Sequence, residues 1–402
     1  MHNSNFIVRE PLLDPKQRVI GYDFAWQDTG NNSAEHKEAE AGALLTFVAE
    51  HLVSEKSGWL LGDKVLFMET VPGQLDSEAM KKLPPKHTVL TLNSSDLAEP
   101  ETLAAVRALH TRGFGIALRG ADVSDENLLS EATHVEVQFS ADDFAAQARR
   151  YAALKKSAVR MVGRPVTTWP DYDACATLGL DAFVGKLHLT PRPGNTAKGL
   201  NPTQRTIVLI MDMVTRNDDI QDIENAFKRD PALSYKVLCF INSAAFGLKN
   251  EVQSLRAALS LLGYKALFQW LSLLLANASS SGYSPVLMET AIIRGRFSEL
   301  LGQDHLPKGE AENLFVVGIF SLLDRLLGIT MAEVLETIQL SDEVKQALLT
   351  RDGPYGAYLA LAEACELNSM LVGPLSASLK ISPEELNVAH LSALSWAQNI
   401  GI

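Results

Sequence analysis

The feature that most constrains the fold is an alternation of short apolar runs and helix-length gaps in the first half of the chain. From Trp26 onward, each gap between successive runs is long enough for one helix. Alternating strands and helices are typical of a parallel sheet, and this number of strands predicts closure into a barrel. The runs are Phe6–Glu10, Arg18–Trp26, Lys64–Thr70, His87–Asn93, Gly115–Gly120, His134–Phe139, Ala158–Gly163 and Ala182–Leu187.

The first two runs depart from this alternation, because only the segment PLLDPKQ joins them. That segment is too short for a crossover helix, so we expect the two strands to pair antiparallel. We expect helices over Glu38–Ser54, Leu97–His110 and Asp142–Lys156. The charged stretch Asp28–Gly42 is interpreted as a solvated loop, with shielding of the barrel mouth as the alternative.

The second half has a helical period without a strand pattern. Helix starts are indicated by Asn201 and Asp230, which each precede a proline, and by capping boxes at Thr330 and Ser382. The prolines and glycines of His188–Gln204 indicate a linker. We therefore predict a modified α/β barrel over residues 1–191, a linker over 192–201 and an all-α domain over 202–402.

Composition limits the classes of function. The net charge of −12 and the pI of about 5.3 argue against general affinity for nucleic acid or anionic membranes. The cysteines, Cys175, Cys239 and Cys365, are too far apart for a metal pair or a disulfide framework. The N-terminus has no signal-peptide pattern, and the apolar run Ala266–Ser279 is short for a membrane span. We expect a cytoplasmic protein.

Three segments of the first half resemble the EAL domain, the cyclic-di-GMP phosphodiesterase family. RVIGYDFAWQ stands where the family has G-x-E-A-L-x-R, and GFGIALRGA matches the segment that ends in A-L-D-D-F-G. LGLDAFVGKLHLTP matches the closing motif with its glycine and proline. The resemblance covers about residues 6–191 and implies a barrel whose site holds two divalent cations through carboxylates at the strand ends.

The residues at those positions differ from the family pattern. Only Asp23 is a near-substitute, as a shorter acid in place of the motif glutamate. The other site positions are changed to Gln27, Glu69, Thr91, Arg119, Gly120, Glu136, Gln138, Gly163, Val166 and Val184. A fixed cation at Arg119 repels a divalent metal, so we expect the resemblance to extend to the fold but not to a catalytic or metal site.

Acid and base are exchanged at two of these positions, since the family has acid at Arg119 and base at Glu136. We hypothesise that these residues form an ion pair that plugs the site, possibly shared with Asp23 or Glu69. Two alternatives stay open. In the first, Arg119 points into solvent. In the second, Asp23, Glu69 and Glu136 still bind a metal ion.

The segment Asp230–Leu271 resembles the HDOD domain, a relative of HD phosphohydrolases that lacks their metal ligands. Where a hydrolase has its histidine and aspartate, this chain has Ser321 and Leu322. We interpret Asn242 and Ser243 as a structural turn, with a ligand contact as the alternative. The matching residues are Asp230, Pro231, Leu233, Lys236, Asn242, Ser243, Phe246, Gly247, Ser254, Ala258 and Gly263.

The two resemblances together imply the EAL–HDOD architecture of bacterial signalling proteins. We expect a non-catalytic regulator of cyclic-di-GMP, motility or attachment pathways. It would be no enzyme and have no cofactor, and it would act by binding an unidentified signalling protein or a second copy of itself. The alternative is a cyclic-di-GMP receptor or a weak phosphodiesterase. No nucleic-acid or membrane partner is expected.

Overall fold

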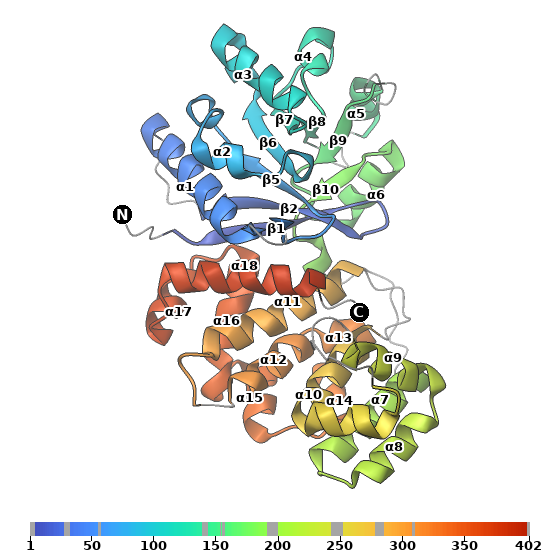
Figure 1. The fold of residues 1–402 in the computed structure, drawn as a ribbon. Coiled ribbons are helices and arrows are strands. Elements are labelled where there is room, and N and C mark those ends of the chain that lie inside the picture. The colour runs from blue at the N-terminus through green and yellow to red at the C-terminus, as the bar shows by residue number, and fades with distance from the viewer. Residues whose placement is uncertain are drawn as a thin grey trace. The chain divides into compact units, whose positions relative to one another are not determined.

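The computed structural model describes residues 5–27, 33–54, 58–138, 144–152, 154, 157–190, 200–242, 252–277, 285–307 and 310–399. These residues form two compact units (Figure 1). The first unit contains residues 1–192, 284–286 and 364–398, and the second contains residues 193–283, 287–363 and 399–402.

The first unit is a closed barrel, as the strand and helix alternation predicts. The strands follow one another around it in the order β1-β10-β9-β8-β7-β6-β5-β2. β1 pairs antiparallel with both β2 and β10, and the other neighbours pair parallel. The strands are β1 (Ile7–Leu13), β2 (Val19–Trp26), β5 (Val65–Glu69), β6 (Thr88–Asn93), β7 (Gly115–Arg119), β8 (His134–Val137), β9 (Arg160–Gly163) and β10 (Ala182–Val184).

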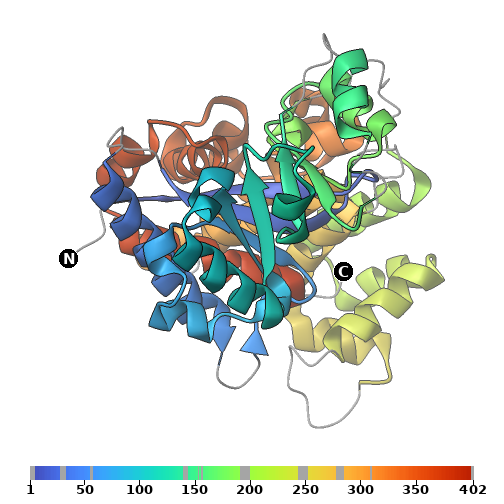
Figure 2. The same ribbon diagram turned by 90° about the horizontal axis from the view of Figure 1, so that it is seen from above.

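Helices lie outside these strands and surround the barrel (Figures 1 and 2). A small hairpin, β3 (Val53–Ser54) and β4 (Gly58–Trp59), follows the first helix and was not expected from the sequence. The helices are α1 (Ala34–Leu52), α2 (Glu78–Lys82), α3 (Pro100–Thr111), α4 (Glu126–Ser130), α5 (Phe144–Tyr151) and α6 (Trp169–Leu178).

The charged stretch at residues 28–42 is only partly the loop that we expected. α1 begins at Ala34, because the side chain of Ser33 accepts a hydrogen bond from the His36 backbone and caps the helix. The interpretation of residues 34–42 as a loop is therefore wrong, and residues 28–32 lie outside the described part of the chain.

Side chains that alternate along the strands fill the barrel interior. Their cluster includes Val184, one of the candidate site positions, which is 1% exposed. This position contributes to the core and offers no group that could contact a ligand. The cluster consists of Leu12, Phe67, Val89, Ala117, Val162, Ala182 and Val184.

The C-terminal helix belongs to the barrel unit. Asn387 of α18 accepts a hydrogen bond from the Ile7 backbone N–H at 2.9 Å and donates one to the Asn5 carbonyl at 3.0 Å. The Gln27 side chain donates to the Ser369 carbonyl at 2.9 Å. These contacts link the N-terminal strands to a segment more than 340 residues away in the chain. The compact units thus differ from a simple division into an N-terminal and a C-terminal half.

The second half is helical, and its predicted helix starts are confirmed. Capping boxes at Asn201 and Thr330 are present, Asp230 caps its helix, and Ser382 and Glu385 exchange hydrogen bonds. The helices are α7 (Pro202–Thr215), α8 (Ile220–Lys228), α9 (Pro231–Ile241), α10 (Leu255–Asn277), α11 (Pro285–Gly302), α12 (Ala311–Phe320), α13 (Leu323–Leu327), α14 (Met331–Thr337), α15 (Asp342–Thr350), α16 (Gly353–Leu367), α17 (Val372–Leu379) and α18 (Pro383–Asn399).

By length and composition, α10 is the single described helix that could cross a membrane. However, 56% of its most apolar window is buried inside the structure, as in the core helix of a soluble protein. The helix is also interrupted at Gly263, whose φ of 69° and ψ of 165° are not helical. A cytoplasmic location stays a prediction.

Candidate functional site

Charged side chains gather where the parallel strands of the barrel end. Glu69 and Arg119 are the last residues of β5 and β7, Glu136 is the next to last of β8, and Asp23 lies in the C-terminal half of β2. Because parallel strands end at one face of a barrel, these residues from separate parts of the chain come together. We call this group, together with Arg164, the mouth network.

The predicted ion pair between Arg119 and Glu136 is confirmed. Arg119 Nε donates to Glu136 Oε2 at 2.8 Å, and Arg119 Nη1 donates to Glu69 Oε2 at 2.8 Å. The Glu136 side chain is 7% exposed and the Arg119 side chain 35%. The guanidinium therefore binds carboxylates of β5 and β8, and the alternative in which it simply points into solvent is wrong.

A second arginine, Arg164, completes the network and was missed in the sequence. Arg164 Nη2 lies 2.5 Å from Asp23 Oδ2, and its Nη1 lies 3.6 Å from Glu136 Oε1. Arg164 directly follows β9, so its place after a parallel strand could have indicated that it lies at the mouth. Glu136 thus stands between two guanidinium groups.

Burial and charge shift the proton affinities in this network. Burial raises the pKa of Asp23 to about 6, and the opposing effect of Arg164 is smaller. Burial opposes the charge of Arg164, yet its ion pair with Asp23 raises the pKa of the guanidinium. Similarly, hydrogen bonds with Glu136 and Glu69 raise the pKa of Arg119 against the effect of burial. Both arginines therefore carry a permanent charge.

The remaining candidate positions of the barrel contribute little charge to the mouth. Thr91 is 1% exposed, and its hydroxyl has no hydrogen-bond partner among the described residues. Gly120 adopts a φ of 68°, and its carbonyl accepts a hydrogen bond from Ser94. Gln138 is exposed, and its carbonyl lies 3.5 Å from the Tyr151 hydroxyl.

The mouth network does not fit a pair of divalent cations. Such cations require several oxygen ligands free of other positive partners, but guanidinium groups already bind Asp23, Glu69 and Glu136. Within the described ranges, no three histidine, cysteine, aspartate or glutamate side chains come close enough to hold a metal ion. No reaction step through a metal is derived for this site.

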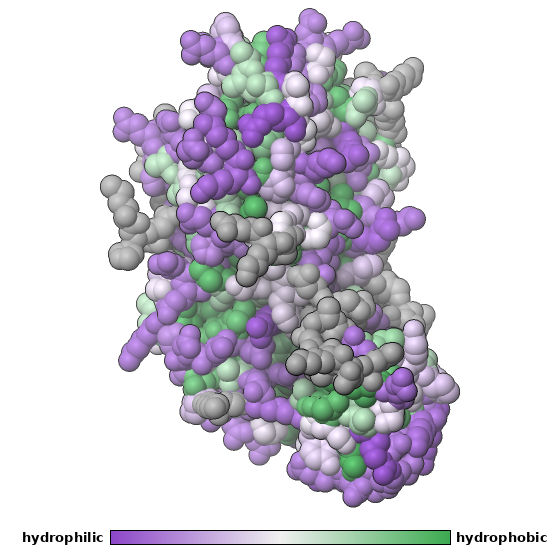
Figure 3. Space-filling model, in the orientation of Figure 1, coloured by the Kyte–Doolittle hydropathy of each residue, from purple (hydrophilic) through white to green (hydrophobic). Residues whose placement is uncertain are grey.

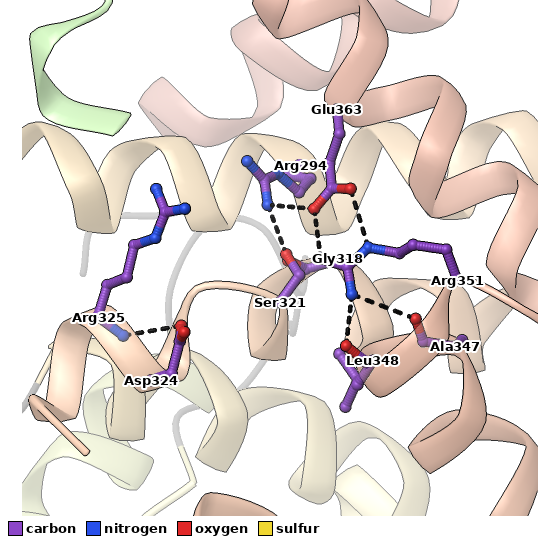
Figure 4. A network of polar contacts seen from close by, with 9 residues as sticks. All are labelled: Arg294, Gly318, Ser321, Asp324, Arg325, Ala347, Leu348, Arg351 and Glu363. Carbon is purple, nitrogen blue, oxygen red and sulfur yellow. Dashed lines mark hydrogen bonds and ion pairs between the residues drawn. The ribbon is translucent and has the colours of Figure 1, made fainter. Parts of the chain in front are cut away.

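A second polar network surrounds Ser321 in the helical unit (Figure 4). Arg294 Nη1 donates to Ser321 Oγ at 2.8 Å and to Glu363 Oε1 at 3.2 Å. Ser321 Oγ in turn donates to the Gly318 carbonyl at 2.6 Å. The Arg294 side chain is 5% exposed, so a buried guanidinium contacts Ser321.

Arg351 approaches the same carboxylate. Its Nε and Nη2 lie 2.9 and 2.8 Å from the two oxygens of Glu363, which is a bidentate contact. Arg351 has a φ of 62°, and Nη1 also donates to the carbonyls of Ala347 and Leu348 at the end of α15. Burial raises the pKa of the nearby Asp324. This network ties α11, α12, α15 and α16 together.

The HDOD signature residues that the structure describes have structural roles. Asp230 caps α9 by accepting from the Leu233 backbone, Pro231 is its first residue, and Lys236 is exposed on it. The Asn242 side chain accepts from the Val252 backbone at 2.7 Å and donates to the Val252 carbonyl at 2.9 Å. These bonds agree with a structural turn. Ser243, Phe246 and Gly247 lie outside the described residues.

In comparisons with known proteins, one family model matches the helical half of the chain. The model of the HDOD domain matches residues 200–347. The chain is 25% identical to the cyclic di-GMP phosphodiesterase CdgJ of Vibrio cholerae, over 99% of this chain and 93% of that protein. It is also 23% identical to the uncharacterized protein YuxH of Bacillus subtilis, over 98% of each chain.

Among solved structures, the chain is similar to BlrP1 of Klebsiella pneumoniae in a complex with calcium and cyclic di-GMP. The sequences are 18% identical, with a TM-score of 0.37, over 46% of this chain and 55% of that chain. A cyclic-di-GMP complex of the PaMucR phosphodiesterase is 17% identical with a TM-score of 0.38, over 48% of this chain and 93% of that chain.

These comparisons correct one expectation from the sequence. We expected the chain to be no enzyme, because both sets of metal ligands are changed. That expectation is contradicted, since a relative that matches almost the whole chain is named as a cyclic di-GMP phosphodiesterase. The changed ligand positions remain a property of the two sites and do not by themselves decide the activity of the protein.

Proposed function

Because the chain joins an HDOD domain to an α/β barrel, as the EAL–HDOD architecture does, we propose that it is a regulatory protein of cyclic-di-GMP signalling that acts by binding other proteins. The relatives supply the pathway, since one that matches nearly the full chain is named for cyclic di-GMP. Motility and surface attachment are the outputs that the architecture implies.

The observation that carries this proposal is the mouth network. Its carboxylates are bound by Arg119 and Arg164, so the charges at the strand ends satisfy one another. Such a network pairs the buried carboxylates with cations of the same chain, so no bound metal ion is needed to neutralise them. A barrel of this kind can present its outer surface and loops to a partner in every nucleotide state of the cell.

Exposed apolar side chains supply candidate contact surfaces. In the barrel unit, Leu367, Met370 and Leu371 are 54%, 79% and 60% exposed within five residues of chain. Tyr235 of the helical unit is 69% exposed. The visible face in Figure 3 is mostly hydrophilic with separate hydrophobic patches. Large exposed apolar and aromatic residues are enriched where proteins bind one another.

The proposal is tested by capturing partners from the native cell with the full chain and with a Met370→Asp/Leu371→Asp variant. Lys380→Asp, an exposed change on the neighbouring α17 cap, is the matched control. We expect one or more signalling proteins to be retained by the wild type and the control but lost from the double variant. Equal retention by all three would refute this surface, and light scattering detects a second copy as the partner.

A second candidate function is hydrolysis of cyclic di-GMP, which the full-length similarity to CdgJ favours. It is tested by incubating the purified chain with cyclic di-GMP and Mg²⁺ or Mn²⁺ and separating the products. Turnover that is abolished by Asp23→Asn and Glu136→Gln, but not by Glu131→Gln on the barrel exterior, would assign the activity to the mouth network. This candidate function is rejected if cyclic di-GMP is not hydrolysed and calorimetry detects no heat of its binding.

A further inference from the structure

The opposite end of the barrel, where the parallel strands begin, contains a cavity of about 1530 Å³. It is lined by the first or second residues of all seven parallel strands, namely Ile20, Val65, Thr88, Gly115, His134, Arg160 and Ala182. This barrel-floor cavity is separate from the mouth network, because no residue of that network lines it. In barrels of this type the floor usually serves stability, so a cavity of this size requires an explanation.

Short helices next to the floor explain why the cavity is open. α4 has five residues and α5 has eight, whereas α1 has nineteen. Helices of one or two turns cover less of the barrel surface than α1 does. The cavity wall accordingly includes Leu129 of α4 and Leu154, which follows α5, together with the strand ends.

The side of the cavity that faces the barrel interior is apolar. Leu12, Val89 and Ala182 belong to the interior cluster of the barrel, and the half-buried Ile20 and Val65 pack against that cluster. All five line the cavity. Apolar strand ends facing a space of this size favour an occupant with an apolar body.

One wall of the cavity carries the positive charge of Arg160. Arg160 begins β9 next to His134 of β8, is exposed, and forms no ion pair with any described residue. Burial lowers the pKa of His134 to about 4, so the neighbouring imidazole is neutral. The lining also contains two acidic residues. Asp181 accepts from the Met161 backbone at 2.8 Å, and Glu126 lies on α4.

We propose that the barrel-floor cavity binds an amphipathic organic anion whose apolar body lies on the strand ends and whose carboxylate pairs with Arg160. Thr133 and His134 are next to this position, and the Thr133 hydroxyl lies 2.8 Å from His134 Nδ1. Because the imidazole is neutral, Arg160 and Lys86 are the cations of the lining, and Arg160 is the one beside Thr133 and His134. Hydrogen bonds with one charged partner are stronger than neutral ones, so the arginine would select an anion over a neutral amphiphile.

The test uses anilinonaphthalene sulfonate, a fluorescent amphipathic anion, with the full chain, and displaces it with decanoate. We expect decanoate to compete at least about tenfold better than decanamide, the neutral analogue of the same length, as expected for one charge-assisted hydrogen bond. Arg160→Gln should weaken decanoate binding about tenfold or more and remove its preference over decanamide. Lys82→Gln, a change on α2 outside the cavity, should leave the affinity for decanoate and its preference over decanamide unchanged.

A second variant tests the place of binding without changing charge. Ser130→Trp puts a large side chain at an exposed position of the cavity wall and should abolish binding of both probes. The proposal is overturned if the wild type binds neither probe, if decanamide competes as well as decanoate, or if Ser130→Trp leaves the affinity unchanged. The comparison of decanoate with decanamide uses the wild type alone and is independent of how well the variants fold.

Discussion

Arg119 Nε donates a hydrogen bond of 2.8 Å to Glu136 Oε2 between the neighbouring strands β7 and β8. The arginine and the glutamate stand at positions where the EAL pattern has an acid and a base. With acid and base exchanged, the cation that binds Glu136 is a side chain of the same barrel.

The first prediction concerns the energy of this pair. In a double-mutant cycle with Arg119→Met and Glu136→Gln, we expect a coupling energy of about 1 kcal/mol, since a partly exposed guanidinium is screened by solvent. Urea unfolding measures it. Glu136→Gln should cost more than Arg119→Met, because Glu136 also faces Arg164. A coupling no larger than that of the exposed pair Arg107–Glu131 would show that the network does not stabilise the barrel.

The second prediction is a pH dependence caused by Asp23. Its pKa of about 6 in the folded state lies above the usual value near 3.8, so the folded protein retains a proton that the unfolded chain releases. The free energy of unfolding should therefore decrease as pH rises from about 4 to about 6, by up to about 3 kcal/mol from this group. Asp23→Asn should remove this part of the slope. If urea unfolding gives the same slope for both proteins, Asp23 has an ordinary pKa.

The third prediction has the opposite sign and concerns His134. Burial lowers its pKa to about 4, so the unfolded chain binds a proton in the range where the folded protein does not. The contribution of His134 to stability should rise as pH rises from about 4 to about 6.5. NMR of the imidazole ring should show a neutral His134 at pH 5.5. Titration near pH 6.5 would contradict the burial of this side chain.

The fourth prediction concerns Glu363 in the helical unit. Glu363→Ala removes a carboxylate that accepts from the buried Arg294 and should lower the free energy of unfolding by about 2–4 kcal/mol. Arg351→Asn retains the Arg294–Glu363 pair and tolerates the positive φ, so it should cost less. Chemical unfolding of both variants gives the comparison, and an equal loss would contradict the central place of Glu363.

The fifth prediction concerns Gly263, which interrupts α10. Its φ of 69° and ψ of 165° belong to a backbone region that is essentially restricted to glycine, so Gly263→Asn should cost about 1–3 kcal/mol. Gly328→Asn is the control, because Gly328 has a φ of 69° but a ψ of 32°, where asparagine is tolerated. The difference in melting temperature between the two variants tests the backbone conformation at Gly263.

Much of the fold could be read from local patterns. The eight strand runs and the antiparallel first pair are confirmed, because period and loop length are properties of neighbouring residues. The caps at Asn201, Asp230 and Thr330 are equally local. The helix expected over Glu38–Ser54 is present as α1, but it begins earlier, at Ala34, within the charged stretch that was interpreted as a loop.

The candidate site was only partly predictable. The exchange of acid and base at Arg119 and Glu136 indicated a pair, and the pair is present. Arg164 was not predicted, because it is not itself a position of the family pattern and only lies between two such positions, Gly163 and Val166. Its contact with Asp23 depends on barrel closure, which brings residues 141 positions apart in the chain within 2.5 Å.

By itself, the sequence determined the eight strand runs and the capped helix starts, because these depend on residues close together in the chain, and its composition determined the acidic balance. Only the tertiary structure decided which charges meet. Pairing of β8 with β7 and β9 placed Glu136 between two arginines, hydrogen bonds with Asn387 joined the last helix to the first strand, and the strand starts came together around the floor cavity. Contacts of this kind depend on the distance between residues in space, which local spacing in the chain does not specify.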